Sequence, residues 1–205
     1  IWITPVVDNI DFNKGLDFNT ADGLAAKQYG YHGYWAKDFT KLDEHLGDIE
    51  TFQQLIEKAH DRGIKIMLDV VVNHAGYGMD GEFNEAWKAD ANNLPTEEEI
   101  ASLNGMFRTV DEDPTVRGEL DNLPDFKTED PEVRQKIIAG QTAWLEKAKT
   151  DRGDTIDFFR IDTVKHVEPA TWQALKNEVT KMNPNFKMIG EYWGAGITND
   201  GGYLG

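Results

Sequence analysis

The stretch TIDFFRIDTVKH (residues 155–166) joins an apolar run to a group of ionisable side chains at its end. Its first half is typical of a buried strand, and Arg160, Asp162, Lys165 and His166 then follow within seven positions. Charged side chains are costly to bury unless they are paired or hydrogen-bonded. Because residues two apart on a strand point the same way, Arg160 and Asp162 are aimed together. The stretch therefore predicts a strand that delivers polar groups to one place.

Three other segments have the same apolar character as TIDFFRID (155–162): IWITPVV (1–7), IKIMLDVVV (64–72) and FKMIGEYW (186–193). Near-continuous apolar runs of this length are typical of strands buried on both faces in a parallel sheet. Amphipathic helices are expected between them, beginning after Asp48, Asp130 and Glu168. Leu55 of the first helix and Met182 of the third are among the side chains expected to face the core. Alternating strands and helices imply right-handed crossovers, so the sequence predicts an α/β fold.

One connection is much longer than the others. About 60 residues separate the strand 64–72 from the helix expected at 131–149, whereas such loops usually have two to six residues. The connection carries apolar side chains of its own: Phe83, Trp87, Leu94, Ile100, Leu103, Met106 and Phe107. We therefore expect an inserted subdomain with a small core, and not a disordered linker.

Composition excludes several classes of partner. The 205 residues are 40% hydrophobic, enough for the core of one or two domains. A net charge of -16 would repel a phosphate backbone, so nucleic acid is not an expected partner. No apolar run reaches the roughly 20 residues that cross a bilayer, so a membrane is not expected either. The absence of cysteine excludes disulfides, and composition sets no oligomeric state.

Polar side chains collect where each expected strand ends. They are Asp69, Asn73 and His74 on the second strand, Arg160 and Asp162 on the third, and Glu191 on the fourth. In a barrel of parallel strands, active sites are built at the carboxyl ends of the strands. We therefore expect these groups to converge on one site.

Asp162 and Glu191 form the most informative pair in that group. They end consecutive strands, which lie about 4.8 Å apart in a sheet. A retaining glycosidase needs its two carboxyl groups roughly 5 to 5.5 Å apart. Arg160 would hold Asp162 ionised, as a nucleophile requires, and the aromatic neighbours of Glu191 would raise the pKa of its carboxyl for proton donation. From spacing alone, a structural ion pair between Arg160 and Asp162 inside a barrel is an equally good interpretation.

Six sequence blocks resemble the signature blocks of the α-amylase family, the family 13 glycoside hydrolases. They are IWITP (1–5), YHGYW (31–35), DVVVNH (69–74), LPDF (123–126), FRIDTVKH (159–166) and GEYW (190–193), in the family's order. The resemblance implies a partial TIM (β/α)8 barrel, about strands 2 to 5, with an inserted subdomain called domain B after strand 3. The implied boundaries are 1–73 for the first barrel part, 74–126 for domain B and 127–205 for the second barrel part.

The same resemblance implies a role for each matching residue. Asp162 would be the nucleophile, Glu191 the general acid/base, and Arg160 the residue that positions the nucleophile. Tyr34 and His74 would contact the sugar in the cleaved subsite, and Lys165, His166 and Trp193 would line the leaving-group side. For His32 and Trp35, substrate contact and core packing both stay open.

A calcium site is also implied by the resemblance. Its ligands would be the side chains of Asn73 and Asp125 and the backbone carbonyl of His166, all oxygen donors that suit a hard cation. The ion would pin the insertion onto the barrel. Taken without the family, Asp125 is better interpreted as a turn residue after Pro124.

The implied activity is retaining endo-hydrolysis of α-1,4-glucosidic bonds in starch or malto-oligosaccharides by a secreted protein. A cyclodextrin glucanotransferase, a neopullulanase or a maltogenic amylase would share this chemistry. A non-catalytic relative, such as a transporter-associated subunit, is the alternative of another class.

The family's third carboxylate, an Asp that follows a His on a later strand, has no match here. The one His-Asp pair, His60 and Asp61, falls in a helix. Together with the abrupt ends of the sequence, this leads us to expect an excised piece of an active enzyme without appreciable hydrolysis of its own.

Overall fold

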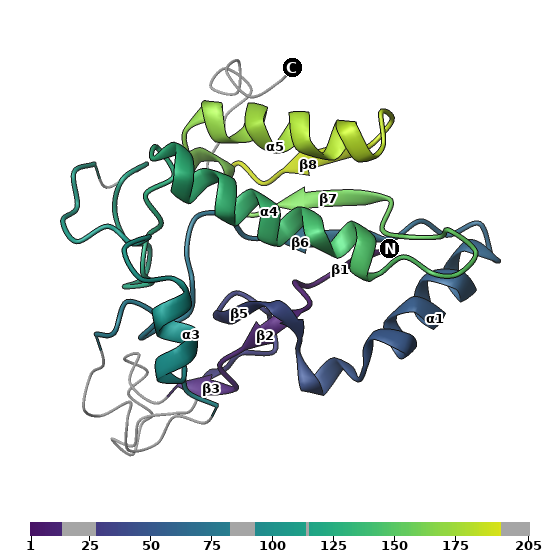
Figure 1. Ribbon diagram of the computed structural model, residues 1–205, viewed down its shortest axis with the longest axis horizontal. Helices are drawn as coiled ribbons and strands as arrows, with labels where there is room; N and C mark the ends of the chain where they lie inside the picture. The colour runs from purple at the N-terminus through teal and green to yellow at the C-terminus, as the bar shows by residue number, and fades with distance from the viewer. Residues whose placement is uncertain (14–27, 83–92, 114, 194–205) are drawn as a thin grey trace.

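A four-stranded parallel sheet runs through the centre of the protein (Figure 1). The computed structural model describes residues 1–13, 28–82, 93–113 and 115–193. The sheet has the order β1 (Trp2–Ile3), β6 (Met67–Val70), β7 (Phe158–Ile161) and β8 (Lys187–Gly190). Leu68 lies beside Phe159, and Phe159 lies beside Met188. The prediction of an α/β fold with four parallel strands is confirmed.

Burial differs between the inner and the outer strands of this sheet. Leu68, Val70 and Phe159 are fully buried on β6 and β7. Trp2 on β1 and Ile189 on β8 are exposed instead. The prediction of strands buried on both faces is therefore wrong for β1 and β8, because each of them has a strand neighbour on one side only among the described residues.

The segment 1–7 is not a single strand, as the sequence had predicted. β1 ends at Ile3, and the chain then leaves the sheet through Pro5, which has no N–H to donate to a strand ladder. The chain continues as β2 (Val7–Asn9), which pairs antiparallel with β5 (Ala36–Leu42). A second small ladder joins β3 (Phe12–Asn13) to β4 (Gln28–Tyr29).

Three helices accompany the parallel sheet: α1 (Ile49–His60), α4 (Pro131–Lys147) and α5 (Pro169–Met182). Figure 1 shows α4 and α5 running alongside β7 and β8. The carboxylates of Asp48 and Asp130 cap α1 and α4 by accepting from backbone N–H groups of the first turn, as expected. Glu168 precedes α5 without capping it, because its carboxylate instead accepts from Thr128 and Arg117.

The main core lies between these helices and the sheet. Its fully buried members include Ile56 of α1, Trp144 of α4 and Leu175 of α5. The indole N–H of Trp144 donates to the carbonyl of Phe39, 3.1 Å away, which fixes α4 against β5. Leu55 and Met182, expected to face the core, are exposed: Leu55 lies at the edge of the buried face of α1, and Met182 is the last residue of α5.

The long connection after β6 packs as a second unit on the first. It contains α3 (Glu97–Ser102), and Met106 and Phe107 are buried in a separate cluster with Phe126. Lys37 of β5 ties α3 to the rest through ion pairs of 2.7 Å to Asp8 and 3.1 Å to Glu99.

The expected small core of the connection is described only in part. Leu103 packs against the Met106 cluster, and Leu94 and Ile100 are half-buried. Phe83 and Trp87 lie outside the described residues. The division of the chain at residues 73 and 126 stays a prediction. Over the described ranges, no helix has the length and apolar character that a membrane span requires.

Candidate active site

Arg160 gathers three carboxylates at the carboxyl end of the parallel sheet. Its Nη1 donates to Oδ1 of Asp162 at 2.8 Å and to Oδ2 of Asp69 at 2.9 Å. Its Nη2 lies 2.8 Å from Oε1 of Glu191. Asp69, Asp162 and Glu191 come from the ends of β6, β7 and β8, so parallel strands bring together residues up to 122 positions apart along a sequence of 205. The predicted convergence of these groups is confirmed by the geometry.

Asp69 is held from several sides and is buried. The hydroxyl of Tyr34 donates to its Oδ2 at 3.0 Å, and the indole N–H of Trp2 donates to the same oxygen at 3.2 Å. The guanidinium of Arg160 also lies over the Trp2 ring, 5.1 Å from its centroid. Asp69 therefore acts as the buried counter-ion that orients Arg160 and Tyr34.

Asp162 has an unusual acidity. The pKa of its carboxyl is raised to about 7 overall: burial raises it most, Arg160 lowers it, and the negative charges of Asp69 and Glu191 raise it. This raised pKa runs against the expectation that Arg160 would hold Asp162 ionised. The reason is that a single guanidinium is shared among three carboxylates, and burial outweighs the share that reaches Asp162.

A cavity of about 520 Å³ opens beside Asp162. Tyr34 and His74 line it together with His32, Trp35 and Thr163. His74 is buried, which lowers its pKa to about 4 and keeps its ring neutral at physiological pH. Its Nε2 lies 3.2 Å from the carbonyl of Tyr34 and donates to it, so the ring is fixed against the segment that carries Tyr34. The cavity thus places two predicted sugar-contacting residues beside the predicted nucleophile.

Two backbone features of the site were missed at the level of sequence. Thr163, next to Asp162, has a φ of 49°, a left-handed conformation that is costly for a β-branched residue. It turns the chain from β7 into the short helix η2 (Val164–His166). A Cβ on Gly190 would lie 2.6 Å from a methyl of Val164, so this glycine lets β8 approach η2. The Gly in GEYW was the available signal for the second feature, and nothing in the sequence pointed to the first.

The structure does not bring the three predicted leaving-group residues to the cavity lining. His166 is turned toward the insertion, where its Nδ1 donates to the carbonyl of Thr115 at 2.6 Å. Lys165 is half-buried in η2, and Trp193 is 75% exposed. Their roles on the leaving-group side stay predictions.

Two of the three predicted calcium ligands are adjacent. An antiparallel bridge pairs His74 with Asp125, and the N–H of Phe126 donates to the carbonyl of Asn73 at 2.9 Å. Asp125 is buried, and Nε of Arg108 already donates to its Oδ2 at 2.8 Å. Burial nevertheless raises the pKa of Asp125 to about 7. Arg108 was not anticipated from the sequence, where it stands 17 positions from its partner.

With strands, carboxylates and cavity in place, comparison with known proteins decides the family. Residues 1–196 match the family model of the alpha-amylase catalytic domain. The chain belongs to the alpha-amylase family. It is 27% identical to the cyclomaltodextrin glucanotransferase of Klebsiella oxytoca over 221 residues, which covers 100% of this chain and 31% of that protein. It is 31% identical to the periplasmic alpha-amylase of Escherichia coli, covering 82% of this chain and 36% of that protein.

Solved structures of alpha-amylase family enzymes have the same fold. An alpha-amylase from Geobacillus thermoleovorans in complex with acarbose matches with a TM-score of 0.63 and 30% identity, covering 94% of this chain and 36% of that one. A three-domain cyclomaltodextrin glucanotransferase matches with a TM-score of 0.70 and 25% identity, covering 97% and 39%. These family members are TIM-barrel enzymes, and the four parallel strands form part of such a barrel. The chain spans about a third of the length of these relatives.

Proposed function

We propose that the protein containing this chain is a retaining endo-hydrolase of α-1,4-glucosidic bonds in starch-like glucans. The observation that carries the proposal is that one guanidinium contacts two carboxylates. Nη1 of Arg160 holds Asp162 and Nη2 holds Glu191, each at 2.8 Å, at the ends of neighbouring parallel strands. Two carboxyl groups held by the same guanidinium suit a nucleophile and an acid/base that act on one glycosidic bond.

The proposed reaction has two steps. Asp162 attacks the anomeric carbon through a carboxylate oxygen while Glu191 donates its proton to the glycosidic oxygen, so that the bond to the leaving sugar breaks. Glu191, now ionised, then removes a proton from water, and the water oxygen displaces Asp162 from the anomeric carbon. Arg160 orients both carboxylates throughout, and the cavity with Tyr34 and His74 receives the sugar on the glycone side.

Glycosyl transfer is a second candidate for the same site. The Klebsiella oxytoca relative that aligns along the whole chain is a cyclomaltodextrin glucanotransferase. Transfer would differ only in the second step, where a sugar hydroxyl takes the place of water. A non-catalytic role is disfavoured because Arg160, Asp162 and Glu191 are all present and in mutual contact.

Product analysis on soluble starch tests the proposal. We expect the full-length protein to release linear malto-oligosaccharides whose first-formed anomer, followed by NMR, is α. Cyclic products would favour transfer, and a β-anomer would contradict a nucleophile at Asp162. A purified, folded protein that releases no sugar from starch or cyclodextrins would contradict the enzymatic role altogether.

We also propose that calcium binds beside Asn73 and Asp125. The raised pKa of the buried Asp125 carboxyl supports this, because a divalent cation would favour its ionised form more strongly than Arg108 alone does. The carbonyl of His166 would complete the protein's oxygen donors. We expect a chelator to lower the melting temperature by several degrees and added calcium to restore it. Asp125→Asn should reduce this response, and a chelator-insensitive melting curve would argue against the site.

We propose that the protein is exported from the cytoplasm. The Escherichia coli relative is a periplasmic alpha-amylase, and an exported enzyme could reach a polymer as large as starch. Fractionation of the natural host should place the protein outside the cytoplasm.

A further inference from the structure

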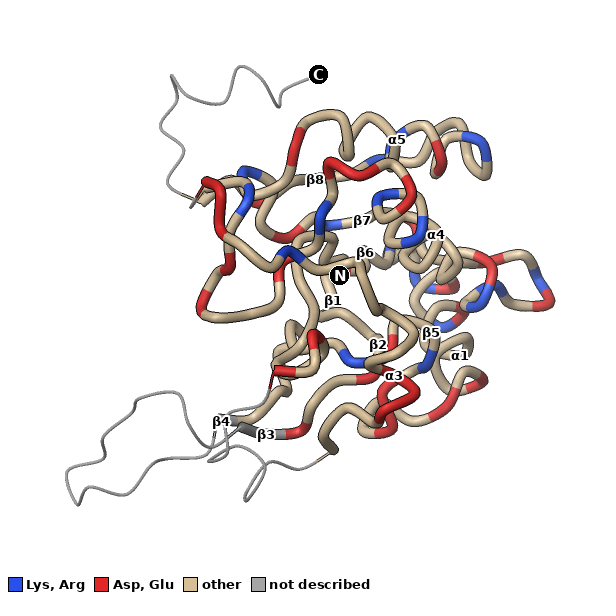
Figure 2. The backbone as a smooth tube through the Cα atoms, turned by 60° about the vertical axis from the view of Figure 1, so that its left-hand side comes forward, with Lys and Arg blue, Asp and Glu red and all other residues tan. Residues whose placement is uncertain are grey.

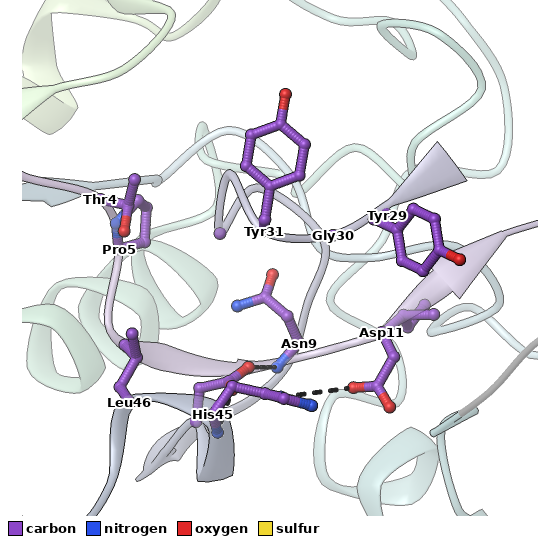
Figure 3. A pocket seen from close by; sticks show the side chains of 12 residues that line it. Thr4, Pro5, Asn9, Asp11, Tyr29, Gly30, Tyr31, His45 and Leu46 are labelled. Atoms are coloured by element: carbon purple, nitrogen blue, oxygen red, sulfur yellow. Dashed lines mark hydrogen bonds and ion pairs between the residues drawn. The ribbon is translucent and has the colours of Figure 1, made fainter. Parts of the chain in front are cut away.

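A second cavity lies next to the segment 29–35, which also carries Tyr34, the residue proposed to contact the substrate. It has a volume of about 430 Å³ and is formed by the chain after β1, the end of β2, the segment 29–33 and the short helix η1 (Glu44–Leu46) (Figure 3). None of the residues assigned to the reaction lines it. In Figure 3, Tyr29 and Tyr31 stand along one side of the cavity, with His45 and Leu46 across from them.

One short segment separates this cavity from the catalytic one. Tyr29, Gly30, Tyr31 and Gly33 line the second cavity, whereas His32, Tyr34 and Trp35 line the cavity beside Asp162. Residues 30–33 form a turn in which the N–H of Gly33 donates to the carbonyl of Gly30 at 2.9 Å, and this turn separates the side chain of Tyr31, in the second cavity, from those of His32 and Tyr34, in the catalytic one. The two cavities are therefore back to back and share a wall of aromatic residues.

Backbone contacts hold the segment that separates the two cavities. The N–H of Gly30 donates to the carbonyl of Asp11 at 2.7 Å, and the N–H of Ile10 donates to the carbonyl of Trp35 at 3.1 Å. Gly33 has a φ of 81°, and a Cβ there would lie 2.8 Å from the carbonyl oxygen of Pro5. This close backbone contact holds the segment against the floor of the cavity. The backbone that carries Tyr29 and Tyr31 is therefore held in place by hydrogen bonds and close packing.

Tyr29 and Tyr31 remain largely open to solvent on this fixed support. Tyr29 is 59% exposed and Tyr31 is 87% exposed. An exposed ring on an anchored backbone offers an apolar platform with little loss of conformational entropy on binding. Pyranose rings have apolar faces that stack on such platforms, and the tyrosine hydroxyls suit the sugar rim.

Polar groups for sugar hydroxyls lie across the cavity. Nδ1 of His45 is 3.0 Å from Oδ1 of Asp43, and the buried Asp43 is itself fixed by the N–H of Asn9 at 3.1 Å. The His45 side chain is 63% exposed, and its Nδ1 also lies 3.8 Å from Oδ1 of Asp11, another residue that lines the cavity. The protein carries a net charge of -16, and acidic positions outnumber basic ones along the backbone (Figure 2), which disfavours an anionic ligand. A neutral polyhydroxylated ligand fits this setting.

We propose that this second cavity is an α-glucan docking site, which holds another stretch of the polymer whose bond is cleaved beside Asp162. The inference rests on the proposed function: because one segment lines both cavities, a polymer bound in the catalytic cavity is the ligand nearest to the second one. Long glucans can occupy both cavities, whereas a trisaccharide fills only one. Tyr31 therefore contributes to the binding of polymer and not to the cleavage of short substrates.

Binding to the full-length protein carrying Asp162→Asn tests the site without hydrolysis. Tyr31→Ala should weaken binding of amylose about three- to tenfold, the size expected for one aromatic contact, and leave maltotriose binding within about twofold. Tyr31→Phe should keep amylose affinity because it keeps the ring. Val110→Ala, a truncation of another exposed apolar side chain, is the matched control and should change neither affinity.

Each outcome has a distinct meaning. Unchanged amylose binding in Tyr31→Ala would overturn the docking site alone. Equal weakening for amylose and maltotriose would place Tyr31 in the catalytic cavity and overturn a separate site. If the Asp162→Asn protein bound neither sugar, the proposed function would fail and the docking site with it. Because Tyr31 is so exposed, melting curves of all variants should coincide.

Discussion

The two ends of strand β7 carry charged clusters of opposite design. At its carboxyl end, one cation, Arg160, faces three carboxylates. At its amino end, among the described residues, three basic side chains meet three carboxylates: His60, Arg152 and Lys65 with Asp61, Asp154 and Asp157. The first cluster is short of positive charge and lies beside a cavity, whereas in the second the basic and acidic side chains are equal in number. The comparison separates a reactive arrangement from a structural one on the same strand.

The pKa values of the carboxyl groups differ between the two clusters in line with their ratio of basic to acidic side chains. The carboxyl pKa of Asp162 is raised to about 7 by burial that its share of Arg160 does not offset. The pKa of Asp154 is lowered, first by its hydrogen bond from His60. Burial raises the pKa of Asp157, but hydrogen bonds from the N–H of Ile66, from Lys65 and from His60 outweigh it and the net shift is downward. A carboxyl with a pKa near 7 is expected at an active site. Carboxyls with lowered pKa values are expected in a structural ion-pair cluster, such as the one around His60, which we call the structural clasp.

His60 holds the structural clasp together. Its Nδ1 lies 2.9 Å from Asp154 and its Nε2 lies 2.8 Å from Asp157. Both ring nitrogens face carboxylate oxygens, so both must donate and the ring must be an imidazolium. This explains why the one His-Asp pair of the sequence cannot supply the family's third carboxylate, because His60 lies at the opposite end of the sheet from Asp162.

The largest expected effect contrasts two aspartates that flank β7. In the full-length protein, Asp162→Asn should lower starch turnover by at least about 10³-fold, because the amide cannot form the glycosyl ester. Asp157→Asn, the same change five positions earlier, should leave turnover within about twofold and lower the melting temperature instead. Reducing-sugar release and thermal melting measure the two effects. Comparable activity in both variants would contradict the assignment of the nucleophile.

The next effect concerns stability at the amino end. His60→Gln keeps a polar side chain but removes the charge, and should reduce the free energy of unfolding by about 2 kcal/mol, the scale of a hydrogen bond to a charged group. His45→Gln is the matched control. His45 also meets an aspartate at 3.0 Å but is mostly exposed, so its loss should cost less than about 0.5 kcal/mol. Urea unfolding at pH 6 measures both changes.

The His60 effect should depend on pH. Burial lowers the pKa of His60, but its two carboxylate partners raise it more, so the folded-state pKa lies above the ordinary value of 6.5. Its stabilising contribution is therefore complete below pH 6.5 and is lost as pH rises through the folded-state pKa. The difference between wild type and His60→Gln should shrink above that pKa. A difference that grew with rising pH would show that the ring is neutral in the folded protein.

The smallest effect is a shift of the activity profile. Asp162 must be ionised to attack, so kcat/KM should fall as pH drops below about 7, well above the ordinary carboxyl range. Asp69→Asn removes a negative charge that raises the pKa of Asp162, and the acid limb should move down by about one pH unit. Initial rates between pH 4 and 9 measure the limb. An acid limb near pH 4 in the wild type would contradict the role of burial at Asp162.

Much of the fold could be predicted because its signals are local. The apolar runs predicted the four parallel strands, and Asp48 and Asp130 predicted where α1 and α4 begin. The antiparallel pairing of β2 with β5 was missed, because β2 follows β1 within a single apolar run and only Pro5 marks the break. The exposure of Leu55 and Met182 was missed as well, because the width and length of a buried helix face depend on what packs against it.

The sequence by itself determined which residues stand at the ends of the parallel strands. Strand period and motif order are properties of neighbouring positions, and they sufficed to bring Asp162, Glu191 and Arg160 together. Only the tertiary structure decided how their charges balance. Asp69 stands 91 positions from Arg160, and Arg108 stands beside Asp125 without any local sign. Desolvation and charge sharing depend on every group packed around a side chain, and that set of neighbours exists only once the chain has folded.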